Sequence, residues 1–522
     1  MKTIVVNRFD NGMQESQYSR IEGGCSVCKH FDAHTYPFRL RPYRGVEADT
    51  TGQTSIGNLL VGSNGLVYGL GSNGSANRIY YKSTAITDAW AALANSTNGG
   101  TALGYELFVE YRDYNAVKRI FFGSYRASDT STAIYMADIT GATGITSHNL
   151  TFTTLGQGIR HPKDDVLYIP YDNKIARYNP TEATESNNWT DAALTLPAAE
   201  TITSIAPYGN YLAIATVPTN AISGIATTGT FKSKVYLWDR DVSLGTVSEV
   251  IDWDTGLLRI INELDGVLIG VSDTKGASAV SPDFDSLLVK AYTGVFPQLL
   301  KEITTRKQTT TAPDAVVNSR VNFISGGKLY FSANIVGGST SPKQYGLWTV
   351  AKSKVSGRYA VTIEAGATND NTETGVLAAV KVGDYFNFVH TAAGTVTRSY
   401  NTTSDADAFN QTSFYESLVN PNMSDVDYMA KKQLKSVTCH YLPLPAAGDT
   451  ITNFITFKYR VDGGDWISVF TESTQGAVAT ERVKTATDEF TSGRQYEFRI
   501  ESTGGAEILG FSYKYEILET NI

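Results

Sequence analysis

The sequence has few of the residues that cross-link or anchor a protein. It contains three cysteines in 522 residues, Cys25, Cys28 and Cys439, too few to hold a fold of this size by disulfides. No stretch approaches the ~18 consecutive apolar residues of a membrane-spanning helix. The N-terminal MKTIVVNRFDNG lacks the apolar core of a signal peptide, since only residues 4–6 would supply it. We therefore expect a protein that folds by burial alone, has no membrane span and is not secreted through a signal peptide.

Charge is also scarce, and its balance is acidic. Charged residues make up 18% of the chain, with 44 Lys and Arg against 52 Asp and Glu, for a net charge of −8. Such a surface disfavours non-specific nucleic-acid binding, which needs a basic patch. It does not exclude DNA that slides past an acidic lining, because the lining repels phosphate. Long stretches of helical periodicity are missing as well, so we expect strands and turns.

Known catalytic motifs are missing from the sequence. It contains no Gly-x-Ser-x-Gly, no His-Glu-x-x-His, no Walker A motif and no Gly-x-Gly-x-x-Gly after a strand. Four acidic pairs fall in loops or a linker, whereas a glycosidase needs two carboxylates that converge from different segments. These pairs are Asp164-Asp165, Asp283/Asp285, Asp405/Asp407 and Asp425/Asp427. We predict that the protein is not an enzyme and needs no cofactor, with a glycan hydrolase as the alternative that these acids leave open.

Cys25-x-x-Cys28, followed by His30 and His34, is a candidate metal site. A structural zinc site usually draws four ligands from paired knuckles, and here a second cysteine pair is missing. Along an extended strand, Cys25 and Cys28 would also lie on opposite faces. We predict that these are ordinary side chains and that no metal is bound; only His30 and His34 could complete a zinc site.

A repeated pattern organises most of the chain. In its clearest copy, residues 320–350, an apolar strand meets the Gly326-Gly327 turn, a second strand alternates from Leu329, and a third ends at Val350. Equivalent second-strand positions recur at steps of about fifty residues. These positions are Tyr68, Ile120, Tyr168, Leu212, Leu268, Tyr330 and Phe386. Four short strands per unit at this period predict a β-propeller of about seven blades.

The whole chain is predicted to be all-β, with the propeller between two other parts. Residues 1–50 show no blade pattern and are expected to form an extended N-terminal arm. The propeller spans 51–402, and the polar residues 403–430 are predicted to be a linker. Residues 431–522 alternate again, with a tight turn at Asp462-Gly463-Gly464-Asp465. We predict a C-terminal β-sandwich of jelly-roll character there.

The arm carries the residues that we consider candidates for subunit docking. Arg39, Arg41 and Arg44 lie around Pro42 and Tyr43, in a stretch that proline keeps extended. Such an arm could close the last blade of its own propeller. It could equally dock on a neighbouring subunit, with the arginines engaging carboxylates there. The predicted docking residues are Arg39, Arg41, Tyr43 and Arg44.

Both ends of the chain resemble virion structural proteins of tailed bacteriophages. At the N-terminus, the resemblance is carried by Phe9-Asp10-x-Gly12-Met13, by Gly23-Gly24 followed by Lys29-His30-Phe31-Asp32, and by Leu40-x-Pro42-Tyr43-Arg44. Near the C-terminus, Lys431–Leu434, the Arg460–Trp466 turn and Arg499–Ile508 are similar to the terminal β-domain of the same proteins. Those proteins place such an arm before a β-propeller, and the architecture resembles the tail nozzle of short-tailed phages.

This resemblance implies a structural role without catalysis. It implies a homo-oligomeric ring, of six subunits in the nozzle, located below the portal and adaptor and around the DNA exit channel. Its partners would be itself, the portal or adaptor and other tail proteins. Genomic DNA would pass without sequence-specific binding, in a virion assembled in the host cytoplasm. Tail-tip, baseplate, capsid-attached, receptor-binding and carbohydrate-binding or glycan-cleaving roles remain alternatives, as does a propeller scaffold that binds a host protein.

Overall fold

The computed structural model describes most of the chain in detail. The described residues are 1–14, 18–43, 45–48, 56–72, 77–83, 89–97, 102–125, 132–182, 187–222, 232–273, 284–306, 315–335, 344–365, 376–383, 385–390, 396–399, 412–444, 454–473, 482–487 and 490–519. The chain forms two compact units. One, here called the propeller unit, comprises Ala48–Ser339 and Thr374–Arg398, and the other, here called the end unit, comprises Met1–Glu47, Thr340–Glu373 and Ser399–Ile522.

Five four-stranded antiparallel sheets follow one another in the propeller unit. The first contains β5 (Ile56–Val61), β6 (Val67–Ser72), β7 (Asn77–Lys82) and β8 (Ala91–Ala92), and the second β9 (Ala102–Arg112), β10 (Lys118–Tyr125), β11 (Thr132–Asp138) and β12 (Thr146–Asn149). The third contains β13 (Ile159–His161), β14 (Val166–Tyr171), β15 (Lys174–Tyr178) and β16 (Trp189–Thr195). The fourth contains β17 (Glu200–Tyr208), β18 (Tyr211–Pro218), β19 (Lys232–Trp238) and β20 (Glu249–Thr255), with the short α1 (Thr219–Ile222) after β18. The fifth contains β21 (Leu257–Leu264), β22 (Val267–Asp273), β23 (Phe284–Tyr292) and β24 (Pro297–Arg306).

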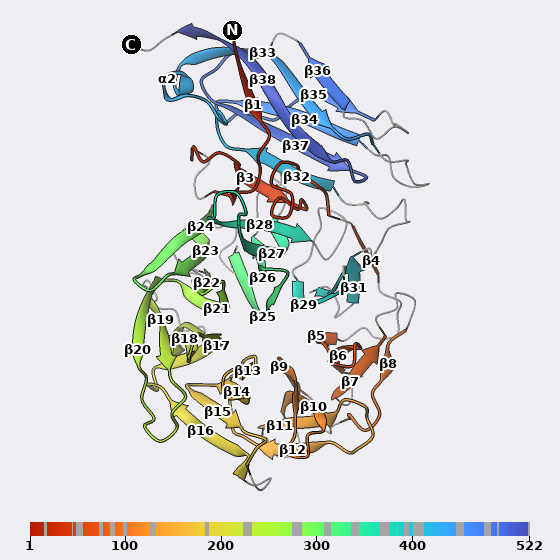
Figure 1. Ribbon diagram of the computed structural model, residues 1–522, viewed down its shortest axis with the longest axis vertical. Helices are drawn as coiled ribbons and strands as arrows, with labels where there is room; N and C mark the ends of the chain where they lie inside the picture. The colour runs from red at the N-terminus through yellow and green to blue at the C-terminus, as the bar shows by residue number, and fades with distance from the viewer. Residues whose placement is uncertain are drawn as a thin grey trace. The chain divides into compact units, whose positions relative to one another are not determined.

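Two further strand groups complete a circle in this unit. The hairpin β25–β26 (Ala315–Ser325 and Lys328–Ile335) and the strands β29 (Val376–Val382), β30 (Tyr385–His390) and β31 (Val396–Ser399) follow the five sheets. The first strands of the seven groups lie innermost (Figure 1). The last of them, β29, packs beside β5. A shared apolar cluster joins these two groups, with Ile56 and Trp90 against Val382 and Tyr385. The unit is a β-propeller.

The prediction of about seven blades is confirmed by these seven first strands. Each of the seven predicted second-strand residues lies in the second strand of its group, and each is at most 5% exposed. The turn between β25 and β26 also has the expected chemistry. Gly326 and Gly327 both have positive φ, 59° and 72°, a conformation that glycine adopts without steric cost. Apolar clusters between successive blades then bury the alternating faces of the strands, so pattern and packing agree.

The end unit contains two main sheets, each built from distant parts of the chain. The first has the order β1-β38-β33-β36, and the second contains β27-β28-β3-β32-β37-β34-β35, with β2 parallel to β3. Their strands are β1 (Lys2–Val6), β2 (Gly12–Met13), β3 (Gly24–Lys29), β27 (Gln344–Lys352), β28 (Tyr359–Ala365), β32 (Thr412–Ser417), β33 (Lys431–Tyr441), β34 (Phe454–Val461), β35 (Ile467–Glu472), β36 (Arg482–Ala486), β37 (Tyr496–Thr503) and β38 (Ile508–Glu519). The unit also contains α2 (Asp425–Tyr428), and β4 (Val46–Ala48) ends in the first residue of the propeller unit.

Aromatic side chains fill the interior between these sheets. Phe511 of β38 lies 5.4 Å from the ring of Phe498 and 5.5 Å from that of Phe457, which come from β37 and β34. Tyr415 of β32 contacts Phe511 as well as Phe9 near the N-terminus. Buried aromatic rings of this size contribute much of the stabilising apolar area. The core of the end unit therefore depends on residues from both ends of the chain.

The division of the chain differs from the one predicted from sequence. Residues 412–417 of the predicted linker form β32, which pairs with β3 on one side and β37 on the other. Residues 2–6 of the predicted arm pair with β38, so the C-terminal strands do not form a sheet system of their own. Local sequence cannot show such pairing, because it joins segments from about 80 to about 500 residues apart. No helix in the described part of the chain has the length and apolar character to cross a membrane.

Candidate functional site

The predicted docking arginines bind a carboxylate of their own chain. Arg39 and Arg41 both pair with Glu507, at 2.9 Å and 3.4 Å, and both guanidinium groups lie over the ring of Tyr36. The backbone between them pairs with Ile508. Tyr43 donates its backbone N–H to the carbonyl of His30, and Arg44 lies outside the described residues. The predicted chemistry, arginine with carboxylate, is present, but within one chain.

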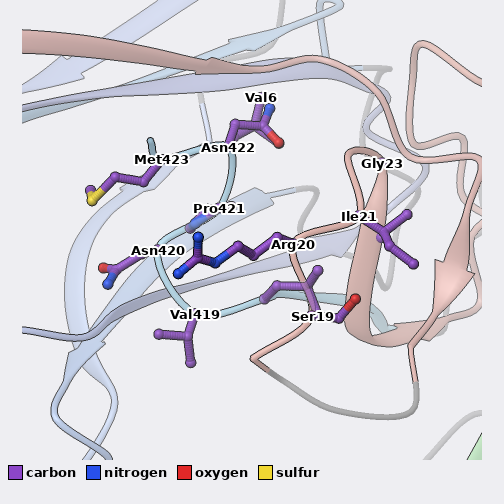
Figure 2. Close-up of a pocket in the computed structure, with 12 residues that line it drawn as sticks. Val6, Ser19, Arg20, Ile21, Gly23, Val419, Asn420, Pro421, Asn422 and Met423 are labelled. Atoms are coloured by element: carbon purple, nitrogen blue, oxygen red, sulfur yellow. The ribbon is translucent and has the colours of Figure 1, made fainter. Parts of the chain in front are cut away.

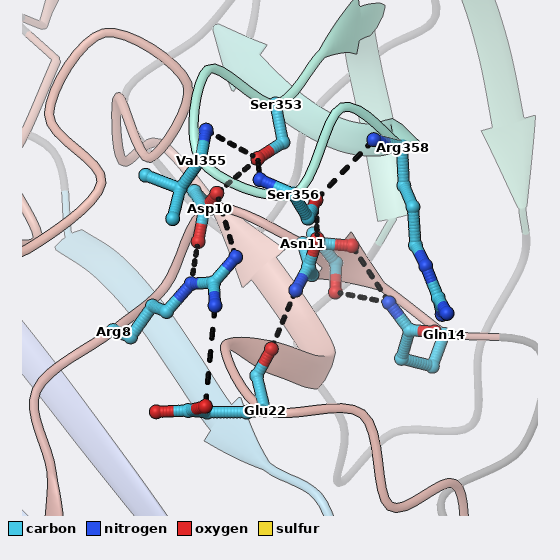
Figure 3. Close-up of polar contacts among 10 residues, drawn as sticks. Arg8, Asp10, Asn11, Gln14, Glu22, Ser353, Val355, Ser356 and Arg358 are labelled. Atoms are coloured by element: carbon cyan, nitrogen blue, oxygen red, sulfur yellow. Dashed lines mark hydrogen bonds and ion pairs between the residues drawn. The ribbon is translucent and has the colours of Figure 1, made fainter.

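The Phe9–Met13 motif forms a buried clasp on the turn between β27 and β28 (Figure 3). Asp10 is fully buried and accepts hydrogen bonds from Arg8 Nε, at 2.6 Å, and from the Ser353 hydroxyl. Ser356 Oγ donates to Asn11 Oδ1 at 2.5 Å. A buried carboxylate needs such partners, because desolvation without them is costly. We call this set of contacts, made by residues 8–13 with residues 353–356, the N-terminal clasp.

The cysteine and histidine cluster is buried in β3 and beside it. The register of β3 against β32 shifts between Cys25 and Val27, and this bulge brings the thiols of Cys25 and Cys28 together in the interior. The expectation that they lie on opposite faces was therefore wrong. The hydrogen bond between the thiols, together with burial, raises the pKa of Cys28 well above its usual value. Nearby, His30 Nδ1 lies 3.2 Å from the Thr412 carbonyl, and His34 Nε2 lies 3.0 Å from Thr362 Oγ1. Within the described residues, no group of three or more His, Cys, Asp or Glu could hold a metal ion.

The acidic pairs act as structural partners wherever the structure describes them. Asp164 accepts hydrogen bonds from Tyr168 and Arg240, and Asp165 pairs with Arg112 and Arg160. Both carboxylates are thus engaged by arginine side chains of their own chain.

In each of the three other acidic pairs, the structure describes at most one of the two carboxylates. Burial by itself raises the pKa of Asp427, but hydrogen bonds from Lys2 and Tyr515 outweigh it and lower that pKa. The side chains of Asp283, Asp285, Asp405, Asp407 and Asp425 lie outside the described residues.

Polar contacts connect neighbouring blades close to the turns between first and second strands. Asn262 Nδ2 donates to Asn322 Oδ1, for example, at 2.9 Å. The other contacts are Ser63 N to Glu110 Oε2 at 2.6 Å, Arg112 Nη2 to Asp165 Oδ2 at 2.6 Å, Arg240 Nε to Asp164 Oδ2 at 2.7 Å, and Gly209 N to Glu263 Oε2 at 3.0 Å. They fix the orientation of each blade relative to the next and position the residues at the centre.

The Arg320 side chain of β25 crosses the axis of the propeller, and Asn322 of the same strand contacts the neighbouring blade. Arg320 donates to Glu106 of the second blade at 3.0 Å and to the Gly57 carbonyl of the first blade at 3.3 Å. Asn322 Nδ2 donates to the Ile261 carbonyl at 3.0 Å. The register shift in β25 between Asn318 and Asn322 makes this reach possible, because the extra residues bend the strand inward. Nothing in the local sequence signals this bulge, and sequence reasoning missed these residues.

A cavity of about 300 Å³ lies beside these side chains. Its lining comes from five blades and is partly apolar and partly polar. The residues are Asn58, Leu59, Leu60, Val61, Phe108, Gln157, Arg320, Asn322, Phe323, Ile324, Ser325, Ala379, Val380 and Lys381. We call it the axial cavity. Apolar walls with a few converging polar groups are typical of small-molecule sites, and this volume is at the lower end of their range.

A second, much smaller cavity lies in the end unit, where residues 19–24 face residues 418–423 (Figure 2). Its volume is about 30 Å³, room for about one water molecule. Asn420 lines it, but the Asn420 amide already donates to the carbonyls of Tyr428 and Arg494, and its oxygen accepts from Tyr496 N at 2.9 Å. This cavity is therefore part of the packing of the unit and does not suit an organic ligand.

Comparisons with known proteins find only distant similarities. No protein-family model and no curated protein matches the chain. Similar solved structures include the Dos1 propeller, 9% identical over 72% of this chain and 82% of that one, with a TM-score of 0.34. A gluconolactonase from Xanthomonas campestris is 10% identical over 76% of this chain and 99% of that one, with a TM-score of 0.34. A protein from Lactobacillus plantarum is 12% identical over 60% and 87%, with a TM-score of 0.36. Likeness at this level supports no conclusion about the activity of this chain.

Proposed function

We propose that the protein is a structural component of a tailed-bacteriophage virion and, specifically, a nozzle-like tail protein. Copies of the chain assemble into a ring around the DNA exit channel and contact the portal or adaptor. The protein performs no catalysis in this role. A closed ring of identical subunits requires heterologous contacts, in which two different faces of each subunit meet.

The N-terminal motif is the observation that carries the proposal. The residues through which it resembles virion proteins include Phe9, Asp10 and Met13, which are at most 1% exposed. A Cβ at Gly12 would lie 2.7 Å from the Val361 carbonyl oxygen, so the fold requires glycine there. The resemblance therefore rests on residues with a defined structural task, which argues against a chance match of a short surface segment.

The closed axis of the propeller is compatible with this role. Arg320 crosses the axis, so a DNA duplex has no passage through the propeller itself. Genome passage would need an opening between subunits, as a ring provides. The net charge of −8 suits a surface past which DNA slides without binding.

The test is the mass of the full-length protein in solution, measured by light scattering alone and after mixing with portal and adaptor proteins. A discrete ring, expected to hold six subunits by the resemblance, or a monomer that becomes a ring on meeting the adaptor, would support the proposal. A lasting monomer or trimer in both conditions would contradict it.

The axial cavity favours a second candidate, a carbohydrate-binding adhesin of the tail tip. Its amide and cationic groups beside the Phe323 ring are the groups that sugar-binding sites use. A protein that stays monomeric or trimeric and binds glycans would move the assignment to this class.

A further inference from the structure

The residues that line the axial cavity include a hydrogen-bond acceptor, Gln157 Oε1, that has no donor among the described residues. Gln157 Nε2 donates to the Phe108 carbonyl at 3.1 Å, and this bond fixes the orientation of the amide. Gln157 Oε1 is shielded from solvent and has no hydrogen-bond partner among the described residues. Buried polar atoms in folded proteins are normally paired, so an unpaired oxygen in a cavity wall marks a position where a ligand hydroxyl or a water would donate.

The charge of the cavity has the opposite sign to that of the protein. Among its described lining residues, Arg320 and Lys381 are cationic and none is a carboxylate, although Arg320 also donates to Glu106, which does not line the cavity. Lys381 carries its ammonium group 5.8 Å from the Phe386 ring. In a chain with a net charge of −8, this lining would attract an anionic group locally.

Another cavity of the propeller unit adjoins the axial cavity. It has a volume of about 630 Å³ and shares Leu60 and Val61 with the axial cavity. Its charged lining consists of three cations and two carboxylates, an excess of one positive charge: Arg112, Lys118, Arg160, Glu110 and Asp165. A ligand longer than one sugar unit would therefore continue into a cationic neighbourhood.

We propose that the axial cavity binds a carboxylated sugar of the uronate type. The carboxylate lies against Lys381 and Arg320, a sugar hydroxyl donates to Gln157 Oε1, and the apolar face of the sugar ring packs on Phe323. A neutral sugar forfeits the ionic contact, and inorganic phosphate, although its P–OH group can donate to Gln157, forfeits the contact with the Phe323 ring. This binding is independent of ring assembly, so either proposal can fail without the other.

The test is calorimetric titration of the full-length protein with sodium glucuronate, glucose and inorganic phosphate. Glucuronate is expected to bind at least about tenfold more tightly than glucose or phosphate, because glucose lacks the ionic contact and phosphate lacks the ring contact. Lys381→Met and Gln157→Glu should each weaken glucuronate binding by about tenfold or more. Lys163→Met, which removes a cation from an exposed turn of the same propeller, should leave it unchanged.

Two results would overturn the proposal. One is the absence of any binding at a glucuronate concentration of about 10 mM, which is well above the dissociation constant expected for a site of this kind. The other is equal affinity for phosphate and glucuronate with no loss in Lys381→Met, which would indicate diffuse surface charge. The ranking of the three probes on the unmodified protein needs no variant, so it decides the question even if a substitution disturbs folding.

Discussion

At the scale of single residues, Gly12 is a position where both backbone conformation and packing constrain the chain. Its φ is +59°, and a Cβ there would lie 2.7 Å from the Val361 carbonyl oxygen and 3.0 Å from the Ala360 Cβ. An L-residue pays about 1–2 kcal/mol for this conformation, and the clash adds to that cost. We predict that Gly12→Ala destabilises the end unit by about 2 kcal/mol or more, measured by denaturant unfolding.

Gly463 supplies the matched control. It has φ +74° in a turn of the same unit, and a Cβ there would meet nothing within 4 Å. Gly463→Ala should therefore cost only the conformational part, about 1 kcal/mol. Equal losses in both variants would show that the close contact of Gly12 with β28 contributes nothing.

Buried tyrosines make stability sensitive to alkaline pH. Burial raises the pKa of Tyr496 to about 12, above its usual value of about 10. Because the folded-state pKa is the higher one, the contribution is complete below pH 10 and is lost as pH rises towards 12. We predict that the unfolding midpoint falls across this window. Tyr496→Phe should be less stable at pH 8, because the Lys432 and Thr491 carbonyls lose a donor. The variant should nevertheless lose less stability between pH 10 and 12, and an unchanged pH slope would count against the explanation.

At the scale of elements, the ion pairs of Arg39 and Arg41 with Glu507 bear on whether these arginines bind within their own chain or dock on a neighbouring subunit. The side chains are partly exposed, 33% for Arg39 and 20% for Glu507, so we expect a coupling energy of only about 0.2–1 kcal/mol. A double-mutant cycle with Arg39→Ala and Glu507→Gln should return this coupling in stability. The mass of the assembled protein should not change. A variant of unchanged stability that no longer assembles would instead support docking of the arginines on a neighbouring subunit.

Because β32 pairs with β37, a C-terminal fragment that begins at residue 431 lacks a strand of its own sheet. In an isolated 431–522 fragment, the edge of β37 that binds β32 is open, and Phe511 loses the neighbouring ring of Tyr415. Exposed strand edges beside apolar surface promote aggregation. We predict that this fragment exchanges its amides rapidly and aggregates, whereas a 412–522 fragment is better protected. Hydrogen exchange of the two fragments measures the difference, and equal protection would mean that β32 is dispensable.

At the scale of the whole molecule, the N-terminal residues and the propeller should respond differently to truncation. Deleting residues 1–43 removes β1, β2 and β3, and β3 lies between β28 and β32 inside a sheet. The first strands of the seven blades belong to residues that this deletion leaves intact. We predict that amide protection is lost in the end unit and kept in β9 to β24, measured by hydrogen exchange of the truncated protein. Loss of protection throughout would show that the propeller needs the N-terminal segment.

The periodic features of this protein could be predicted from its sequence. Gly326-Gly327 and the alternation from Leu329 are local signals, and each blade repeats them, so strand positions and an approximate blade number followed. The N-terminal motif likewise stood out as residues 9–13. These predictions succeeded because a blade buries its faces against neighbours of the same kind, and the pattern of burial is therefore written into each repeat.

Only the tertiary structure determined which distant segments meet. The bulges in β3 and β25 each shift the register of a strand, and one of them brings Cys25 and Cys28 together while the other sends Arg320 across the axis. A shift of one residue turns side chains to the other face, and no local signal specifies it here. The partners Glu507 for Arg39, Ser353 for Asp10 and Glu106 for Arg320 are likewise far away in sequence. The sequence by itself therefore determined the repeating strands of the propeller, because their burial is periodic. The axial cavity, the clasp and the shared end unit were decided by long-range packing, which places non-periodic residues side by side.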